Sequence, residues 1–277
     1  MSGLSWIRRV NGTLGHVAPQ LVARKMRQLF MKPRERLPRD WELPLLARAE
    51  RITLRCGLSA LRWGEGPTVL LMHGWEGRPT QFASLIEALE AAGYTAVALD
   101  GPAHGRSPGS EAHVVLFARA MLEAAAELPP LRAVIGHSMG GASAMFAVQL
   151  GLRTETLVSI SAPARILDLL RGFARYMGMP SRARSAFIHE VEQKVGMRAA
   201  ALDVAHYQLD MPGLIVHAED DHFVAVQESE LIHQAWFDSR LLRLEEGGHQ
   251  RVLADPRVID GVLALVTGRR PPARQSA

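Results

Sequence analysis

Short apolar segments alternate with longer helix-like segments through the middle of the chain, and this alternation restricts the fold more than any other feature. The apolar segments are Thr68–Met72, Tyr94–Leu99, Leu131–Ile135 and Thr156–Ile160, and the helix-like segments are Thr80–Ala92, Glu111–Leu128 and Ser138–Gly151. Alternating strands and helices predict an α/β protein with a mostly parallel central sheet and helices on both faces. The chain has 277 residues, 48% of them apolar, which is enough for one large core.

The same pattern continues on either side of a long interruption. Arg51–Ala60 alternates apolar and polar residues and predicts a single antiparallel edge strand. Residues from Pro163 to about Leu209 contain no such strand but hold helical segments, of which Ile166–Met177 and Ala186–Val195 are the clearest. We expect this insertion to form a lid over the strand ends. Strands and helices then resume, in the order Gly213–His217, Val226–Trp236, Arg240–Leu244 and Asp255–Thr267.

These boundaries divide the chain into five parts. A basic extension (residues 1–48) precedes the first part of the core (49–162), the lid insertion (163–209), the second part of the core (210–267) and a flexible tail (268–277). The expected tail is polar and contains two prolines, which is typical of a frayed terminus.

Positive charge is concentrated in the N-terminal extension. Residues 1–40 hold nine Lys and Arg side chains against two carboxylates, whereas the whole chain carries only +4. This distribution argues against a nucleic-acid-binding catalytic domain, whose basic surface should lie on the fold itself. Pro19–Met31 predicts an amphipathic helix with Val22, Met26, Leu29 and Phe30 on one face. We favour a helix packed on the domain, and weak contact of residues 1–40 with an anionic membrane surface is the alternative.

The segment Gly136-His137-Ser138-Met139-Gly140 matches the pattern G-x-S-x-G and lies between an apolar strand and a helix-like segment. A sharp strand-to-helix turn at this point would expose the Ser138 hydroxyl, and the two glycines would make room for the turn. The helix that begins at Met139 would also direct backbone N–H groups toward an anion beside the serine. The motif therefore makes Ser138 a candidate nucleophile.

A serine nucleophile needs a base, and the base needs a group that orients it. His249 directly follows the predicted strand Arg240–Leu244 and two glycines. Three consecutive acids, Glu219, Asp220 and Asp221, follow the strand Gly213–His217. Because the carboxyl ends of parallel strands meet at one edge of a sheet, one of these acids is expected to face His249.

On these residues the chain resembles the α/β-hydrolase-fold serine hydrolases of esterase and lipase type, over roughly residues 50–267. The order Ser138, Asp221, His249 is that family's order of nucleophile, acid and histidine. The resemblance implies Asp221 rather than Asp220 as the acid, because the family's acid stands three residues before a hydrophobic residue, here Val224.

Two further segments carry the resemblance. His73-Gly74-Trp75 is similar to the family's oxyanion-hole turn, which implies backbone N–H donors from Trp75 and Met139. Asp100–Ser107 is similar to the family's D-x-P/R-G-H-G-x-S loop, with Ala103 where glycine is common. The implied activity is that of a carboxylesterase-like enzyme that passes through an acyl-enzyme intermediate. We expect His73 and His104 to bond loop backbone, and His137 to point away and pack against the sheet.

Composition narrows the remaining possibilities. The single cysteine, Cys56, excludes an internal disulfide, and nothing in the sequence indicates a metal or an organic cofactor. The chain shows neither a signal-peptide pattern nor an apolar stretch of membrane-spanning length, so we expect a cytoplasmic protein acting on a small-molecule acyl substrate.

The sequence leaves the substrate class open. The alternatives are a non-catalytic small-ligand-binding protein on the same fold, and a thioesterase or amidase acting on an anionic acyl substrate. The second alternative uses seven basic residues of the insertion, which we otherwise interpret as a solvated lid surface: Arg165, Arg171, Arg175, Arg182, Arg184, Lys194 and Arg198.

Overall fold

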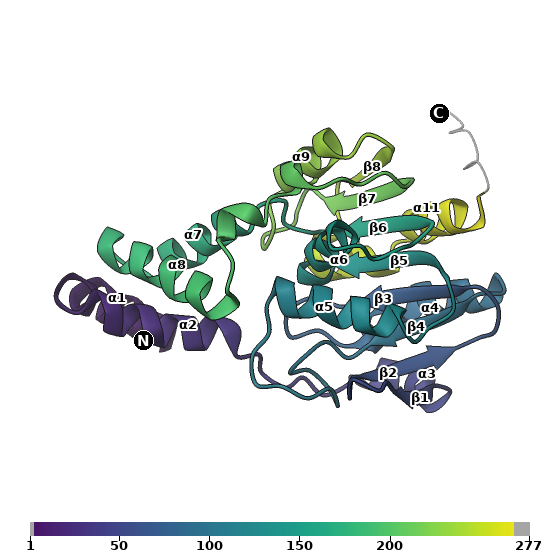
Figure 1. Ribbon diagram of the computed structural model, residues 1–277, viewed down its shortest axis with the longest axis horizontal. Coiled ribbons are helices and arrows are strands. Elements are labelled where there is room, and N and C mark those ends of the chain that lie inside the picture. The colour runs from purple at the N-terminus through teal and green to yellow at the C-terminus, as the bar shows by residue number, and fades with distance from the viewer. Residues whose placement is uncertain (1–2, 269–277) are drawn as a thin grey trace.

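The computed structural model describes residues 3–268 and places a twisted sheet between two layers of helices (Figure 1). The described strands form one eight-stranded sheet in the order β1-β2-β4-β3-β5-β6-β7-β8. β1 and β2 pair antiparallel with their neighbours, and β3 to β8 run parallel, as predicted. The strands are β1 (Glu50–Thr53), β2 (Ser59–Trp63), β3 (Thr68–Met72), β4 (Thr95–Leu99), β5 (Leu131–His137), β6 (Thr156–Ile160), β7 (Gly213–Ala218) and β8 (Ser239–Leu244).

The helices of the described chain fall into a sheet-covering set and a set that projects from one end of the sheet (Figure 1). The first set is α3 (Leu43–Ala47), α4 (Ala83–Ala91), α5 (Val114–Ala125), α6 (Met139–Gln149), α9 (Gln227–Ala235), the short α10 (Gly248–Arg251) and α11 (Pro256–Thr267). The second set is α1 (Gly3–Val17), α2 (Pro19–Met31), α7 (Ile166–Tyr176) and α8 (Ser181–Val195). Short 3-10 turns are η1 (Asp40–Glu42), η2 (Pro79–Phe82), η3 (Ala199–Ala201), η4 (Val204–His206) and η5 (Val252–Ala254).

Strand side chains alternate between two hydrophobic cores, one on each face of the sheet. In β3, Leu70 and Met72 pack with α5 and α6, whereas Val69 and Leu71 pack with α4 and α11. All five residues of β3 are buried. A strand buried on both faces needs apolar side chains at every position, which is why these strands appear in the sequence as continuous apolar runs.

The prediction of a single edge strand at Arg51–Ala60 is wrong in one respect. Arg51–Ala60 is a tight hairpin that joins β1 and β2, not a single strand. Leu54 N–H donates to Leu58 O, and Gly57 closes the turn with a φ of +85°. The alternating pattern did not show this reversal because apolar residues continue on both sides of the turn. The hairpin places β2 beside β4 and leaves β1 at the sheet edge.

The second set of helices joins the N-terminal extension to the insertion. α2 has the bounds predicted for the amphipathic helix and packs along α8 (Figure 1). Val22 and Met26 are buried in the same core as Phe187 of α8, whereas Leu29 is half-exposed. The preferred interpretation of this helix as packed on the domain is therefore confirmed, and membrane contact stays a prediction. We call α1, α2, α7 and α8 the helical cap.

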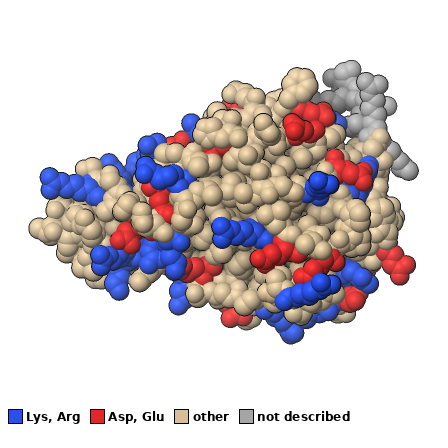
Figure 2. All heavy atoms as spheres, in the orientation of Figure 1, with Lys and Arg blue, Asp and Glu red and all other residues tan. Residues whose placement is uncertain are grey.

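The surface of the helical cap is rich in Lys and Arg (Figure 2). No helix within residues 3–268 is long and apolar enough to cross a membrane. The predicted flexible tail, apart from Gly268, lies outside the described residues.

Candidate active site

Ser138 lies in a strained turn between β5 and α6. Its backbone has φ 54° and ψ −121°, a region that side chains other than glycine rarely adopt. A Cβ atom on Gly136 would come within 2.4 Å of Gly140 O, so the turn requires glycine at that position. The Ser138 N–H donates to Ile160 O of β6 at 2.8 Å. The predicted turn is thus present, and the neighbouring strand anchors it.

His249 and Asp221 continue from Ser138 in one hydrogen-bonded series. The Ser138 hydroxyl lies 2.9 Å from His249 Nε2, and His249 Nδ1 lies 2.8 Å from Asp221 Oδ2. Asp221 Oδ1 accepts the N–H groups of Phe223 and Val224 at 2.8 and 3.0 Å. These bonds fix the carboxylate, so Oδ2 faces the imidazole.

Asp220 has a different contact. Its Oδ1 accepts the Gly248 N–H at 2.6 Å, and its Oδ2 lies 3.6 Å from Arg251. The structure therefore brings Asp221, and not Asp220, to His249. His249 itself lies in the single helical turn α10, directly after Gly247 and Gly248.

The surroundings of Asp221 favour its charged form. Burial alone would raise the pKa of this carboxyl, but hydrogen bonds from His217, His249 and the Val224 N–H outweigh burial and hold the pKa well below its usual range. His217, at the end of β7, is fully buried, and its Nε2 lies 2.9 Å from Val224 O and 3.4 Å from Asp221 Oδ2. Sequence reasoning assigned no role to His217, because a histidine inside an apolar strand is more often structural.

His137 contacts His249 directly, which corrects the expectation that it points away. Its Nδ1 lies 3.1 Å from Gln81 Nε2 and its Nε2 lies 2.7 Å from His249 O. The Gln81 amide can only donate at this contact, so Nε2 of His137 carries the proton and donates to the His249 carbonyl. Burial, followed by the charge of His249, lowers the pKa of His137 to about 3. Neutral His137 therefore holds the backbone of the histidine that contacts Ser138.

The His73–Gly74–Trp75 turn approaches the Ser138 turn closely. A Cβ atom on Gly74 would lie 2.8 Å from Ser138 Cβ, so only glycine leaves room for this approach. The Gly101 N–H donates to His73 Nε2 at 2.9 Å, which leaves His73 Nδ1–H to donate to Gly74 O at 2.7 Å. The expectation that His73 bonds loop backbone is confirmed. Within residues 3–268, no backbone carbonyl accepts a hydrogen bond from the Trp75 N–H.

The Trp75 side chain belongs to an aromatic group supplied mostly by the helical cap. Phe30 of α2 stacks on Trp75 with ring centroids 6.3 Å apart and also packs against Phe173 of α7 and Phe187 of α8. Phe187 is fully buried, whereas the other three rings are partly exposed. Phe30 was predicted on the apolar face of its helix, but no local pattern indicates that it reaches Trp75.

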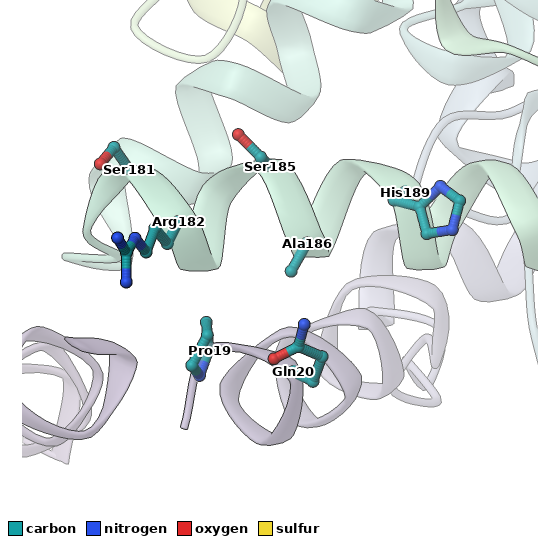
Figure 3. A pocket seen from close by; sticks show the side chains of 7 residues that line it. All are labelled: Pro19, Gln20, Ser181, Arg182, Ser185, Ala186 and His189. Carbon is teal, nitrogen blue, oxygen red and sulfur yellow. The ribbon is translucent and has the colours of Figure 1, made fainter. Parts of the chain in front are cut away.

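Neither a metal centre nor the main groove of the described chain adds residues to this site. Among residues 3–268, no group of three or more His, Cys, Asp or Glu side chains is placed to hold a metal ion. A groove of about 670 Å³ lies between the start of α2 and α8, and its lining residues belong to the helical cap rather than to the strand ends (Figure 3). They are Pro19, Gln20, Ser181, Arg182, Ser185, Ala186 and His189.

Comparison with known proteins places this chain in a family. Residues 69–261 match the Alpha/beta hydrolase family. Two human proteins, serine hydrolase-like protein and serine hydrolase-like protein 2, are each 31% identical to the chain over an alignment of 119 residues, which covers 40% of this chain. The match spans 58% of the first human protein and 38% of the second.

Solved structures agree at the level of the fold. An esterase from Pyrococcus furiosus has a TM-score of 0.62 and 21% identity, with 86% of this chain and 98% of that chain covered. An esterase from Exiguobacterium antarcticum has a TM-score of 0.59 and 17% identity, with 78% of this chain and 98% of that chain covered. At such identities the likeness shows a shared fold alone.

Proposed function

We propose that this chain, which belongs to the alpha/beta hydrolase family, hydrolyses an ester or related acyl bond with Ser138 as nucleophile, His249 as base and Asp221 as the orienting acid. One observation carries the proposal: the series Ser138 Oγ, His249 Nε2, His249 Nδ1 and Asp221 Oδ2 is joined by contacts of 2.9 and 2.8 Å. A hydroxyl in such a series can lose its proton as it attacks a carbonyl carbon.

The reaction has two acyl-transfer steps. His249 Nε2 takes the Ser138 proton as the oxygen attacks, and then gives it to the leaving alcohol, which leaves an acyl-enzyme. The backbone N–H groups of Trp75 and Met139 would stabilise the negative oxygen of each tetrahedral intermediate. Water then attacks the acyl-enzyme and gives a proton to His249, which returns it to the Ser138 oxygen as the acyl–oxygen bond breaks and the acid product departs. Asp221 stabilises the imidazolium without taking its proton.

The surroundings of the turn favour a neutral ester with an apolar group. One partly exposed ring, Trp75, belongs to the turn itself, and two more, Phe30 and Phe173 of the helical cap, continue from it in ring contact. Four of the seven basic residues of the insertion already contact carboxylates, which leaves less charge for an anionic thioester. These four are Arg165, Arg171, Lys194 and Arg198.

The test is covalent labelling with a fluorophosphonate probe followed by peptide mapping. We expect the label on Ser138 in the wild type and no label in a Ser138→Ala control. A folded wild-type chain that stays unlabelled would contradict the proposal and favour a non-catalytic ligand-binding protein. A panel of p-nitrophenyl esters of increasing chain length, run beside acyl-CoA thioesters, then decides the substrate class, and faster turnover of the thioesters would replace the ester proposal.

A further inference from the structure

The backbone at Glu76, directly after Trp75, has an unfavourable conformation. Its φ is 51°, in the left-handed region that residues other than glycine rarely adopt. Gly74 and Gly77 flank the Trp75–Glu76 pair, and the Gly77 N–H donates to Gly74 O at 3.0 Å, which closes a turn across the pair. Such a conformation persists only where surrounding contacts hold it.

Beyond this turn hydrogen bond, the contacts to the Glu76 side chain come from the N-terminal extension. Arg34 Nε and Nη2 donate to the two carboxylate oxygens of Glu76 at 2.8 and 3.0 Å, and the Arg34 backbone N–H donates to Oε1 at 3.2 Å. Arg36 donates from Nη2 and Nε to Oε2 at 2.7 and 3.2 Å. The Glu76 N–H donates to His104 Nε2 at 3.0 Å. Glu76 is therefore held by its side chain and by its backbone.

The burial of the three side chains is uneven. The Glu76 side chain is only 11% exposed, whereas those of Arg34 and Arg36 are 76% and 52% exposed. Burial alone would raise the pKa of Glu76, but hydrogen bonds from Arg34 and Arg36 hold it at about 2, so the carboxylate stays charged at neutral pH. Arg34 meets the nearly buried carboxylate bidentately, and Arg36 donates twice to its Oε2. Such charge-assisted pairs give geometric precision, whereas exposed ion pairs alone add little stability.

The same segment also holds the residue before Glu76. Phe30, at the end of α2, lies over the Trp75 ring, with an angle of 16° between the two ring planes. Residues 30–36 thus contact two neighbouring residues of the turn. Phe30 contacts the Trp75 ring, and Arg34 and Arg36 contact the side chain of Glu76, which directly follows Trp75. The N–H that the proposed function assigns to the oxyanion hole belongs to the peptide group between Gly74 and Trp75, directly before the Cα atom that carries the contacted Trp75 ring.

We propose that residues 30–36 are a positioning element that fixes the Trp75 N–H toward Ser138. The inference rests on the proposed function and adds to it the part of the chain that keeps one oxyanion donor in place. Such donors act only at hydrogen-bond distance from the developing negative charge. A small displacement of the turn therefore reduces stabilisation of the transition state more than it reduces substrate binding.

The variants that test this proposal remove the charge pairing without touching the turn backbone. They are the double variant Arg34→Gln/Arg36→Gln, the single variant Glu76→Gln and the triple variant. Arg257→Gln is the matched control, because Arg257 makes similar bidentate contacts to Asp255, at 3.0 and 2.8 Å, at the start of α11. Should the double variant fail to fold, Arg36→Gln alone keeps the Arg34 contacts and serves in its place.

The measurements separate positioning from stability. For a p-nitrophenyl ester we expect kcat to fall roughly 10- to 100-fold with KM within about twofold, because removal of a whole oxyanion donor costs about 10²–10³. The affinity for a trifluoromethyl ketone, which mimics the tetrahedral intermediate, should fall by a similar factor. The triple variant should lose no more than Glu76→Gln, since both break the same contact.

Different results would overturn different statements. If the wild type hydrolyses esters and the double, single and triple variants at Arg34, Arg36 and Glu76 keep the wild-type kcat and ketone affinity, residues 30–36 have no positioning role. The positioning role is also refuted if the control Arg257→Gln loses as much activity, or if the variants lose kcat only at temperatures where they unfold. A wild type that neither reacts with the probe nor hydrolyses esters would overturn the proposed function, and this inference with it.

Discussion

Replacement of Asp221 by asparagine tests the proposed triad most directly, because the structure predicts which atom the new amide would place against His249. The Oδ1 of Asp221 is fixed by N–H donors from Phe223 and Val224 at 2.8 and 3.0 Å. An asparagine must keep an oxygen there, since an NH2 group would oppose two donors. Its NH2 group then occupies the Oδ2 position, 2.8 Å from His249 Nδ1 in the wild type.

The consequence is the wrong tautomer of His249. Nδ1 must accept from the amide, so the proton moves to Nε2, the atom that lies 2.9 Å from the Ser138 hydroxyl. A protonated Nε2 cannot act as the base. In serine hydrolases the same substitution lowers kcat by roughly 10⁴, equivalent to about 5 kcal/mol of transition-state stabilisation.

The assay compares kcat for a p-nitrophenyl ester in Asp221→Asn and Asp220→Asn. Asp220→Asn keeps the acceptor for the Gly248 N–H and loses only the 3.6 Å contact with exposed Arg251, so its kcat should stay within about fivefold of wild type. Thermal melting curves confirm that both variants are folded. A folded Asp221→Asn variant with near wild-type kcat, or a larger loss in Asp220→Asn, would refute the assignment.

Two further predictions concern the residues around the site. His137→Leu leaves the Gln81 amide and the His249 carbonyl without their buried partner and should cost roughly 2–4 kcal/mol of unfolding free energy in urea, while an unchanged urea midpoint would show that neither hydrogen bond matters. Glu76 has a pKa lowered from 4.5 to about 2, so its ionised form stabilises the folded chain above pH 4.5, and this contribution is lost as the pH falls toward 2. The wild type should therefore be more stable than Glu76→Gln in urea at pH 6, with a difference that shrinks below pH 4.5; a difference that stays constant would contradict the ion pair.

The features that were predicted correctly are indicated by patterns within short segments of the sequence. Buried parallel strands are continuous apolar runs, and the strand–glycine–serine–glycine–helix order of the Ser138 turn lies within a dozen residues. The choice of Asp221 over Asp220 came from a resemblance rather than from geometry. Consecutive side chains point in different directions, and only the folded chain shows that Asp220 faces the Gly248 backbone.

The features that were missed depend on contacts between distant parts of the chain. α1 contains three glycines and one asparagine, which weaken a helix, and tertiary contacts offset this weakness. The buried Asn11 side chain donates to Met177 O at 2.8 Å, and a Cβ atom on Gly15 would meet Pro180 at 2.6 Å. Likewise, 42 residues separate Arg34 from Glu76, and no pattern within either segment indicates that they meet.

The helical cap and the proposed oxyanion turn depend on each other through a small number of side chains. Phe187 of α8 is fully buried, and part of that burial comes from Phe30 of α2. Loss of α2 would return much of this ring to water, at a cost of up to about 3 kcal/mol, and would remove the stacking contact of Trp75 in the same step. A contact that stabilises the cap therefore also fixes the turn, so substitutions on the α2–α8 interface should change ester preference and turnover together.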